Sequence, residues 1–189
     1  MDQSAESMNT EESKKIEEIF RNSESHDELF DAFQIAVNIK FRDPEVFKIL
    51  IANPVLSPDE IKMFTEKLIN VIPEQTYNIL MWTGKIFESH PNHYDHLEDA
   101  FNYYNRAISH QPESFMPYLR LLNLYNYEID YPMNRKIIGT IENLASKVDQ
   151  KSKVYYALSA HYKKCGNKDL EAEYLAMAEK ETRRETQIL

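Results

Sequence analysis

The sequence predicts an all-α protein built from antiparallel helical hairpins. Only three glycines occur among 189 residues, Gly84, Gly139 and Gly166. No run alternates apolar and polar residues between turn residues, as a strand with one solvated face would. Apolar side chains recur instead three and four positions apart along most of the chain. With 42% apolar residues, including 12 Tyr and 9 Phe, the chain has enough apolar surface for one folded unit.

The N-terminal third is expected to comprise a tail followed by short helices. Residues 1–11 are mostly polar and acidic, so we predict a flexible tail. Helical spacing begins near Glu12 with Ile16 and Phe20. We interpret residues 12–73 as N-terminal helices that form either a cap or a degenerate repeat.

Three start signals place helices within that region. Ser25 and Ser57 each precede a glutamate by three positions, which is the spacing of a capping box. Asp43-Pro44 places a capping residue directly before a proline at the first helical position. Helices are therefore predicted from about residues 26, 44 and 58.

The remaining residues, 74–184, are predicted to form helical hairpins and a C-terminal helix. The expected helices cover residues 74–89, 95–110, 113–128, 132–147, 152–164 and 168–184. Their connections are short, as in antiparallel neighbours.

A repeat links these hairpins. Tyr118, Leu121, Leu122 and Tyr125 recur 37 residues later as Tyr155, Leu158, Ser159 and Tyr162. A second series of small residues falls near the end of the second helix of each pair, at Ala107, Ala145 and Ala178. Small residues there would let neighbouring helices approach closely, and aromatic rings would fill the grooves between pairs.

These residues resemble the tetratricopeptide repeat, a 34-residue helical hairpin. The first copy matches at Gly84, Phe87, Ala100, Tyr104, Ala107 and Pro112, with residues 91–94 inserted between its helices. The second matches at Tyr118, Leu121, Tyr125 and Ala145, and the third at Tyr155, Leu158, Tyr162, Gly166 and Ala178. Leu122 and Ser159 depart from the pattern because they stand where it has glycine.

The resemblance implies a short right-handed α-solenoid whose first helices line a concave groove. Its members usually act as adaptors, co-chaperones or scaffold subunits, which bind an extended or helical peptide segment of another protein. The transferred groove residues are Lys85, Met116, Arg120, Asn123, Tyr127, Lys153, Tyr156, Lys163 and Lys164. Further inward positions hold Asn78, Met81, Leu119, Ala157 and Ala160.

Three histidines, His90, His93 and His96, lie within seven residues. A zinc site needs ligands held by rigid elements, whereas this spacing runs through the inserted turn. We therefore interpret the stretch as an elongated turn, with no metal and no cofactor. A metal-dependent helical enzyme that uses these histidines is the least favoured alternative.

Charge and composition limit the possible partners of the protein and its cellular compartment. The formal charge of −9 disfavours nucleic acid, and no apolar run is long enough for a membrane span. The single cysteine fits the cytoplasm, or the nucleus. A local group of lysines comprises Lys151, Lys153, Lys163, Lys164 and Lys168. This group forms either a solvated face or a binding site for an acidic peptide segment.

The sequence therefore predicts a non-enzymatic protein-interaction module. The main alternative is an obligate subunit of an oligomer or larger complex, assembled through the N-terminal helices of residues 12–55.

Overall fold

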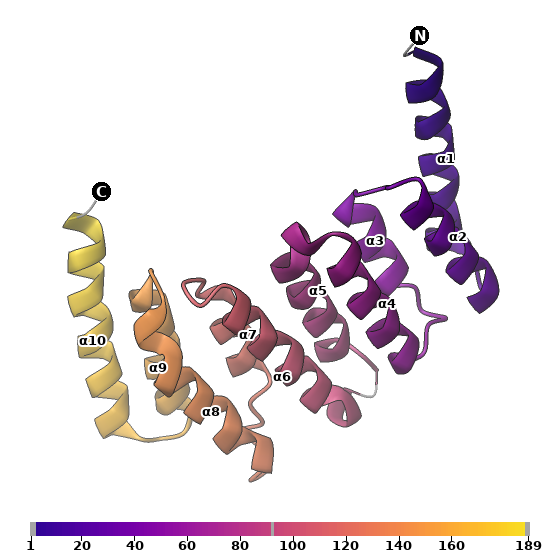
Figure 1. Ribbon diagram of the computed structural model, residues 1–189. Coiled ribbons are helices and arrows are strands. Elements are labelled where there is room, and N and C mark those ends of the chain that lie inside the picture. Colours follow the sequence, from indigo (N-terminus) through magenta and orange to yellow (C-terminus); the bar gives the residue numbers. More distant parts are fainter. Residues whose placement is uncertain (1–2, 92, 188–189) are drawn as a thin grey trace. The chain divides into compact units, whose positions relative to one another are not determined.

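A computed structural model of the protein describes the backbone of residues 3–91 and 93–187, and side chains from residue 11 onward within these ranges except at residue 93. These residues form helices and no strand, which confirms the all-α class (Figure 1). The chain divides into two compact units, Met1–Thr83 and Gly84–Leu189, where composition led us to expect one. The division lies inside helix α5 (Thr76–Glu88).

Over its described residues, from 3 to 83, the first unit holds four α-helices, a short 3-10 helix and the start of α5. Their bounds are α1 (Gln3–Asn22), α2 (His26–Asn38), α3 (Pro44–Ile51), α4 (Pro58–Val71) and η1 (Pro73–Gln75). Phenylalanine rings form the centre of its core. The Phe33 ring lies 6.0 Å from that of Phe47 and 5.2 Å from that of Phe64, and all three side chains are at most 2% exposed. Complete burial of such a side chain contributes about 1.5–3 kcal/mol.

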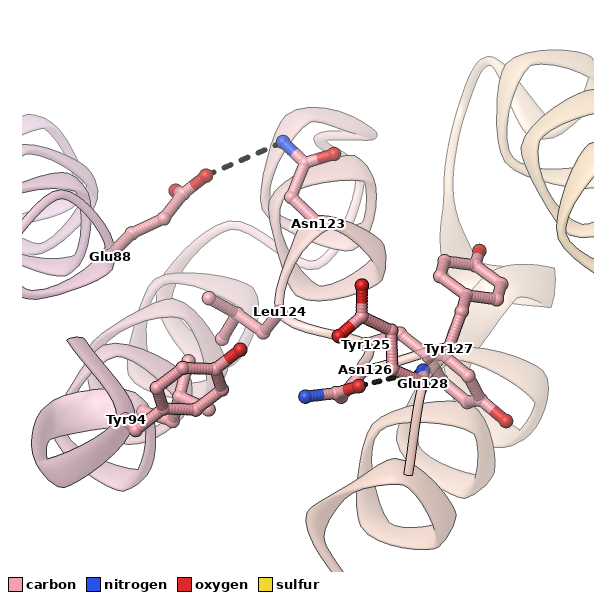
Figure 2. Close-up of a pocket in the computed structure, with 9 residues that line it drawn as sticks. Glu88, Tyr94, Asn123, Leu124, Tyr125, Asn126, Tyr127 and Glu128 are labelled. Carbon is pink, nitrogen blue, oxygen red and sulfur yellow. Dashed lines mark hydrogen bonds between the residues drawn. The ribbon is translucent and has the colours of Figure 1, made fainter. Parts of the chain in front are cut away.

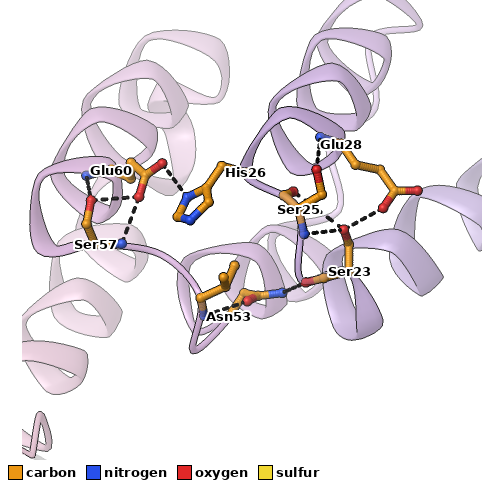
Figure 3. Close-up of polar contacts among 8 residues, drawn as sticks. Ser23, Ser25, His26, Glu28, Asn53, Ser57 and Glu60 are labelled. Atoms are coloured by element: carbon orange, nitrogen blue, oxygen red, sulfur yellow. Dashed lines mark hydrogen bonds and ion pairs between the residues drawn. The ribbon is translucent and has the colours of Figure 1, made fainter.

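The predicted starts of α2, α3 and α4 are confirmed by their caps. Ser57 Oγ accepts the amide hydrogen of Glu60, and Glu60 Oε2 accepts that of Ser57, which completes a capping box. Ser25 Oγ caps α2 in the same way, but Glu28 Oε2 accepts the Ser23 hydroxyl instead (Figure 3). His26 Nδ1 lies 2.7 Å from Glu60 Oε1 and so joins the starts of α2 and α4.

Helix α1 begins at Gln3, about nine residues before the predicted start near Glu12. The prediction relied on apolar spacing, which begins only at Ile16. Glu, Gln, Ala and Met are nevertheless good helix formers, and acidic residues are favourable near a helix N-terminus, so a helix can extend beyond its apolar stripe. The flexibility of residues 1–11 stays a prediction, and residues 1 and 2 lie outside the described part of the chain.

The second unit continues with further helices that pack against one another. Their bounds are α6 (His93–His110), α7 (Met116–Asn123), α8 (Pro132–Leu144), the 3-10 helix η2 (Ala145–Lys147), α9 (Lys151–Lys164) and α10 (Lys168–Gln187). Figure 1 shows α9 and α10 side by side at the C-terminal end. The Tyr162 and Tyr174 hydroxyls, one from each of these helices, both donate to Glu142 Oε1 on α8.

Small residues lie where helices of this unit approach closely. Ala100, Ala107, Ala145 and Ala178 are all at most 3% exposed. Gly84 on α5 lies directly under the Tyr104 ring of α6, and a Cβ atom at Gly84 would come within 2.6 Å of that ring. A side chain there would collide with a ring that is itself fully buried. The position therefore requires glycine for close packing.

Helix α7 is shorter than the predicted 113–128, because it ends at Asn123. The cause is a side-chain network that competes with helical hydrogen bonds. Asn126 Oδ1 accepts the amide hydrogens of Glu128 and Ile129. The buried Asn134 side chain of α8 accepts the Asn126 amide hydrogen through Oδ1 and donates to the Asn126 carbonyl through Nδ2. Residues 124–131 consequently form an ordered loop.

Candidate functional site

The residues predicted to line a groove lie on α5, α7, α9 and the loop after α7. Eight of the nine are exposed, and the ninth, Arg120, is half-buried. Helices α7 and α9 pack against each other within the second unit, and some of the predicted residues line the hollow between them. Lys85 is exposed on α5 and is not among the residues that line the hollow between them.

A groove of about 630 Å³ runs between α7 and α9, and we call it the α7–α9 groove. Its lining residues are Leu119, Leu122, Asn123, Tyr125, Tyr127, Ala157, Ala160, His161 and Lys164. Three of these belong to the nine transferred groove residues: Asn123, Tyr127 and Lys164. Three more, Leu119, Ala157 and Ala160, were expected at further inward positions, whereas Asn78 and Met81 are not among the lining residues. The groove is open along α9 because Ala157 and Ala160 present only methyl groups to it.

Tyr127 reaches the groove from the loop and not from a helix. The prediction placed it one helical turn after Asn123, but α7 has already ended there. Its hydroxyl lies 3.0 Å from His161 Nδ1, and Lys164 Nζ lies 5.1 Å from the centre of its ring. Two contacts with α9 thus hold the side chain at the edge of the groove.

His161 is the main groove residue that the sequence did not reveal. It is 3% exposed, and the Tyr125 ring meets its imidazole edge to face at 4.4 Å. Its Nε2 lies 3.6 Å from the Cys165 thiol, which is not among the groove-lining residues. Burial lowers the pKa of His161, with an opposing effect from Glu142 and a further lowering by Lys164. A single histidine on a helix carries no sequence signal that distinguishes such a position.

A smaller hollow of about 290 Å³ adjoins the groove and shares Asn123, Tyr125 and Tyr127 with it. Figure 2 shows Glu88 on one side of this hollow, with the Asn123 amide directed toward its carboxylate. Asn123 Nδ2 lies 3.5 Å and Arg120 Nη1 3.7 Å from Glu88 Oε1. The Tyr104 hydroxyl donates to Glu88 Oε2, and burial together with this carboxylate raises the pKa of Tyr104.

Arg120 and Asn123 are therefore already partnered. The arginine helps to neutralise a carboxylate that is only 18% exposed, so its charge is not fully available to a ligand. Sequence position placed both residues on the inward face of α7 but did not reveal this shared partner, which lies more than 30 positions earlier.

Two lysines lie on the groove-facing side of α9, Lys164 in the groove lining and Lys153 outside it. Positions 153, 157, 160 and 164 share one face of a helix. Lys153 Nζ lies 4.0 Å from the centre of the Phe115 ring at the start of α7, and Lys164 contacts Tyr127 beyond its other end. Within the described residues, neither lysine forms an ion pair, whereas Lys163 lies 4.0 Å from Glu171. Helix α9 itself contains no Asp or Glu.

The histidine stretch differs from the elongated turn that was predicted. Helix α6 already begins at His93, so only residues 89–92 connect it to α5. His96 lies in the first turn of α6, where Asp99 Oδ2 is 3.2 Å from its Nδ1. The His90 and His96 rings meet edge to face at 4.6 Å, and the side chain of His93 lies outside the described part. The inserted residues thus partly lengthen a helix.

No group of three His, Cys, Asp or Glu side chains is placed to hold a metal ion among the residues that the structure describes. Similarly, none of the described helices has both the length and the apolar character of a membrane span. Comparison with known proteins adds no family. No family model, curated protein or solved structure matches the chain.

The groups that surround the α7–α9 groove are suited to binding a ligand that carries both apolar and charged groups. Leucine and alanine side chains form an apolar floor, while the Tyr127 ring and the Lys164 ammonium stand at one edge. Met116, Tyr127 and Tyr156 are between 41% and 44% exposed, which is high for large apolar side chains. Such a surface can bury an apolar side chain of a ligand and pair with charge beside it.

Proposed function

We propose that the protein is a non-enzymatic interaction module that holds a peptide segment of another protein in the α7–α9 groove. The observation that carries the proposal is the groove of about 630 Å³, with an apolar floor and three large apolar side chains left exposed on α7, α9 and the loop between α7 and α8. Exposed aromatic and methionine side chains around a concave apolar surface are typical of protein-binding sites.

A repeat architecture of the tetratricopeptide type belongs to the same proposal. It is supported by the glycine and alanine residues buried between helices of the second unit. In a right-handed solenoid, α7 and α9 would be the first helices of successive hairpins and would line the concave face. An adaptor, co-chaperone or scaffold role in the cytoplasm or nucleus follows as the expected setting.

The proposal is tested by filling the groove. Peptides selected from a random display library on the wild-type protein would be measured by fluorescence anisotropy against Ala160→Trp and Ala172→Trp. Ala160 lines the groove, whereas Ala172 lies on α10, and both are exposed. We expect Ala160→Trp to abolish binding and Ala172→Trp to leave it unchanged. Unaltered binding to both variants would refute the groove as the site.

An obligate oligomer through the N-terminal helices is the second candidate. The observation in its favour is the exposure of Phe30 and Ile35 on α2, at 36% and 44%. Sedimentation velocity over a range of concentrations distinguishes the two. A stable oligomer that Ile35→Asp dissociates would support this candidate, and a monomer throughout would eliminate it.

A further inference from the structure

Lys164 lines one end of the α7–α9 groove, and Lys153 lies on the same face of α9, beyond Ala157 in the other direction. Lys153, Ala157, Ala160 and Lys164 share one face of α9, and the two methyl groups lie between the two ammonium groups along the helix. Because an α-helix rises about 1.5 Å per residue, the Cα atoms of Lys153 and Lys164 are roughly 16 Å apart.

Both lysines lean toward the α7 side of the groove. Lys153 Nζ lies over the Phe115 ring at 4.0 Å, and Lys164 Nζ over the Tyr127 ring at 5.1 Å. An aromatic face attracts a cation but leaves its charge uncompensated, so each ammonium group can still bind a carboxylate. Among the described residues neither lysine has a carboxylate partner within ion-pair distance, although the chain carries nine more negative than positive charges overall.

Several acidic groups act near this surface, and each has other partners or lies outside the groove. Glu142, which acts on His161, accepts the Tyr162 and Tyr174 hydroxyls. Asp130, which acts on Tyr125, lies 3.8 Å from Arg135. Glu88 and Glu128 line the adjoining hollow and not the groove itself. Glu88 is occupied by Arg120, Asn123 and the Tyr104 hydroxyl. Glu171 lies 4.0 Å from Lys163, a different lysine of α9.

We infer that the groove recognises an extended acidic peptide in which two carboxylates flank an apolar side chain, at positions i, i+2 and i+4. The inference rests on the proposed function and names the chemistry of the partner. Alternation along an extended chain directs these three side chains to one face, and they span about 13 Å at roughly 3.3 Å per residue. The flexible lysine stems cover the remaining few ångströms. The central apolar side chain then lies over Ala157 and Ala160.

The test uses the full chain and three fluorescein-labelled synthetic peptides of the same length. One carries Asp-Ser-Leu-Ser-Asp at its centre, a second has the same composition with the aspartates adjacent, and a third has lysines in place of the aspartates. We expect the first peptide to bind several-fold more tightly than the second, the third not to bind, and high salt to weaken the interaction.

Charge reversal on α9 identifies the residues responsible. Removal of one exposed ion pair corresponds to a loss of about two- to fivefold in affinity, and reversal of the charge to a larger loss. Lys153→Glu and Lys164→Glu should each weaken binding of the first peptide, and each should improve binding of the lysine peptide. Lys180→Glu, which makes the same change in net charge on α10, should alter neither.

Two results with these peptides would overturn the inference. One is binding of all three peptides with equal affinity, and the other is equal loss in Lys164→Glu and Lys180→Glu. Tighter binding of a single-stranded oligothymidine than of the acidic peptide would also overturn it, since the site would then recognise phosphate. If one of these results is obtained while library-selected peptides still lose binding in Ala160→Trp, the proposed function stands and only this inference fails.

Discussion

Single glycines in this protein differ sharply in what surrounds them. Gly84 lies under the buried Tyr104 ring, whereas a Cβ placed at Gly139 on α8 would meet nothing within 4 Å besides its chain neighbours and the backbone of its own helix. We predict that Gly84→Ala destabilises the protein by about 1–3 kcal/mol through overpacking. Gly139→Ala should stabilise it by about 0.5–1 kcal/mol, because alanine favours a helix interior.

Urea unfolding followed by far-UV circular dichroism measures both effects. Each variant adds one methyl group to a helix of the second unit, so Gly139→Ala controls for helix propensity. Stability changes of the same sign and size in the two variants would show that the Gly84–Tyr104 contact does not limit packing.

Buried His161 makes the free energy of unfolding depend on pH. Its pKa is lowered from the ordinary value of 6.5, chiefly by burial, so the unfolded chain binds a proton more readily than the folded one. The free energy of unfolding should therefore fall as the pH drops below about 6.5, and level off below the folded pKa. Acidic groups that face this region, such as Glu142, oppose the shift but do not reverse it.

Thermal unfolding of wild type and His161→Gln at neutral and mildly acidic pH separates this histidine from the other titrating groups. Glutamine keeps a hydrogen-bonding side chain but cannot gain a charge in this range. The decrease in Tm on acidification should be smaller in the variant. An equal decrease in both proteins would mean that His161 carries none of the dependence.

Among the elements, the helices themselves could be predicted more fully than their ends. The caps Ser25, Asp43 and Ser57 act locally, so their sequence signals located three helix starts correctly. The end of α7 depends instead on Asn134, a residue of the next helix, which bonds to the Asn126 backbone. Such a contact has no signature in the local sequence, and the predicted end of α7, residue 128, lies five residues beyond its observed end at Asn123.

The loop after α7 therefore allows a test of whether Asn134 holds residues 124–131 in place. Asn134→Ala removes the side chain that fixes residues 124–131 and leaves backbone groups unpaired, at a cost of about 1–3 kcal/mol. We expect amide hydrogen exchange to accelerate in this loop, including at Tyr127. Asn143→Ala, at an exposed position on the same helix, serves as the control and should leave the exchange unchanged. Protection that persists in Asn134→Ala would show that the loop is held by other contacts.

At the scale of the whole molecule, periodicity predicted an all-helical chain but not the division of that chain into two compact units. The structure separates two compact units within α5, a helix whose own pattern shows no break. Groove residues were predictable where helical spacing continues, as for Asn123 on α7 and Lys164 on α9. His161 and the pairing of Glu88 with Arg120 were not, because they depend on which helices become neighbours.

The central claim is that a peptide binds between α7 and α9. Backbone amide chemical-shift mapping of the isotopically labelled full chain, titrated with a library-selected peptide, tests it most directly. The largest changes should fall at Leu119, Asn123, Ala157, Ala160 and Lys164, the residues that line the groove. Changes confined to the first unit or to the outer face of α10, with the α7 and α9 amides unmoved, would contradict it.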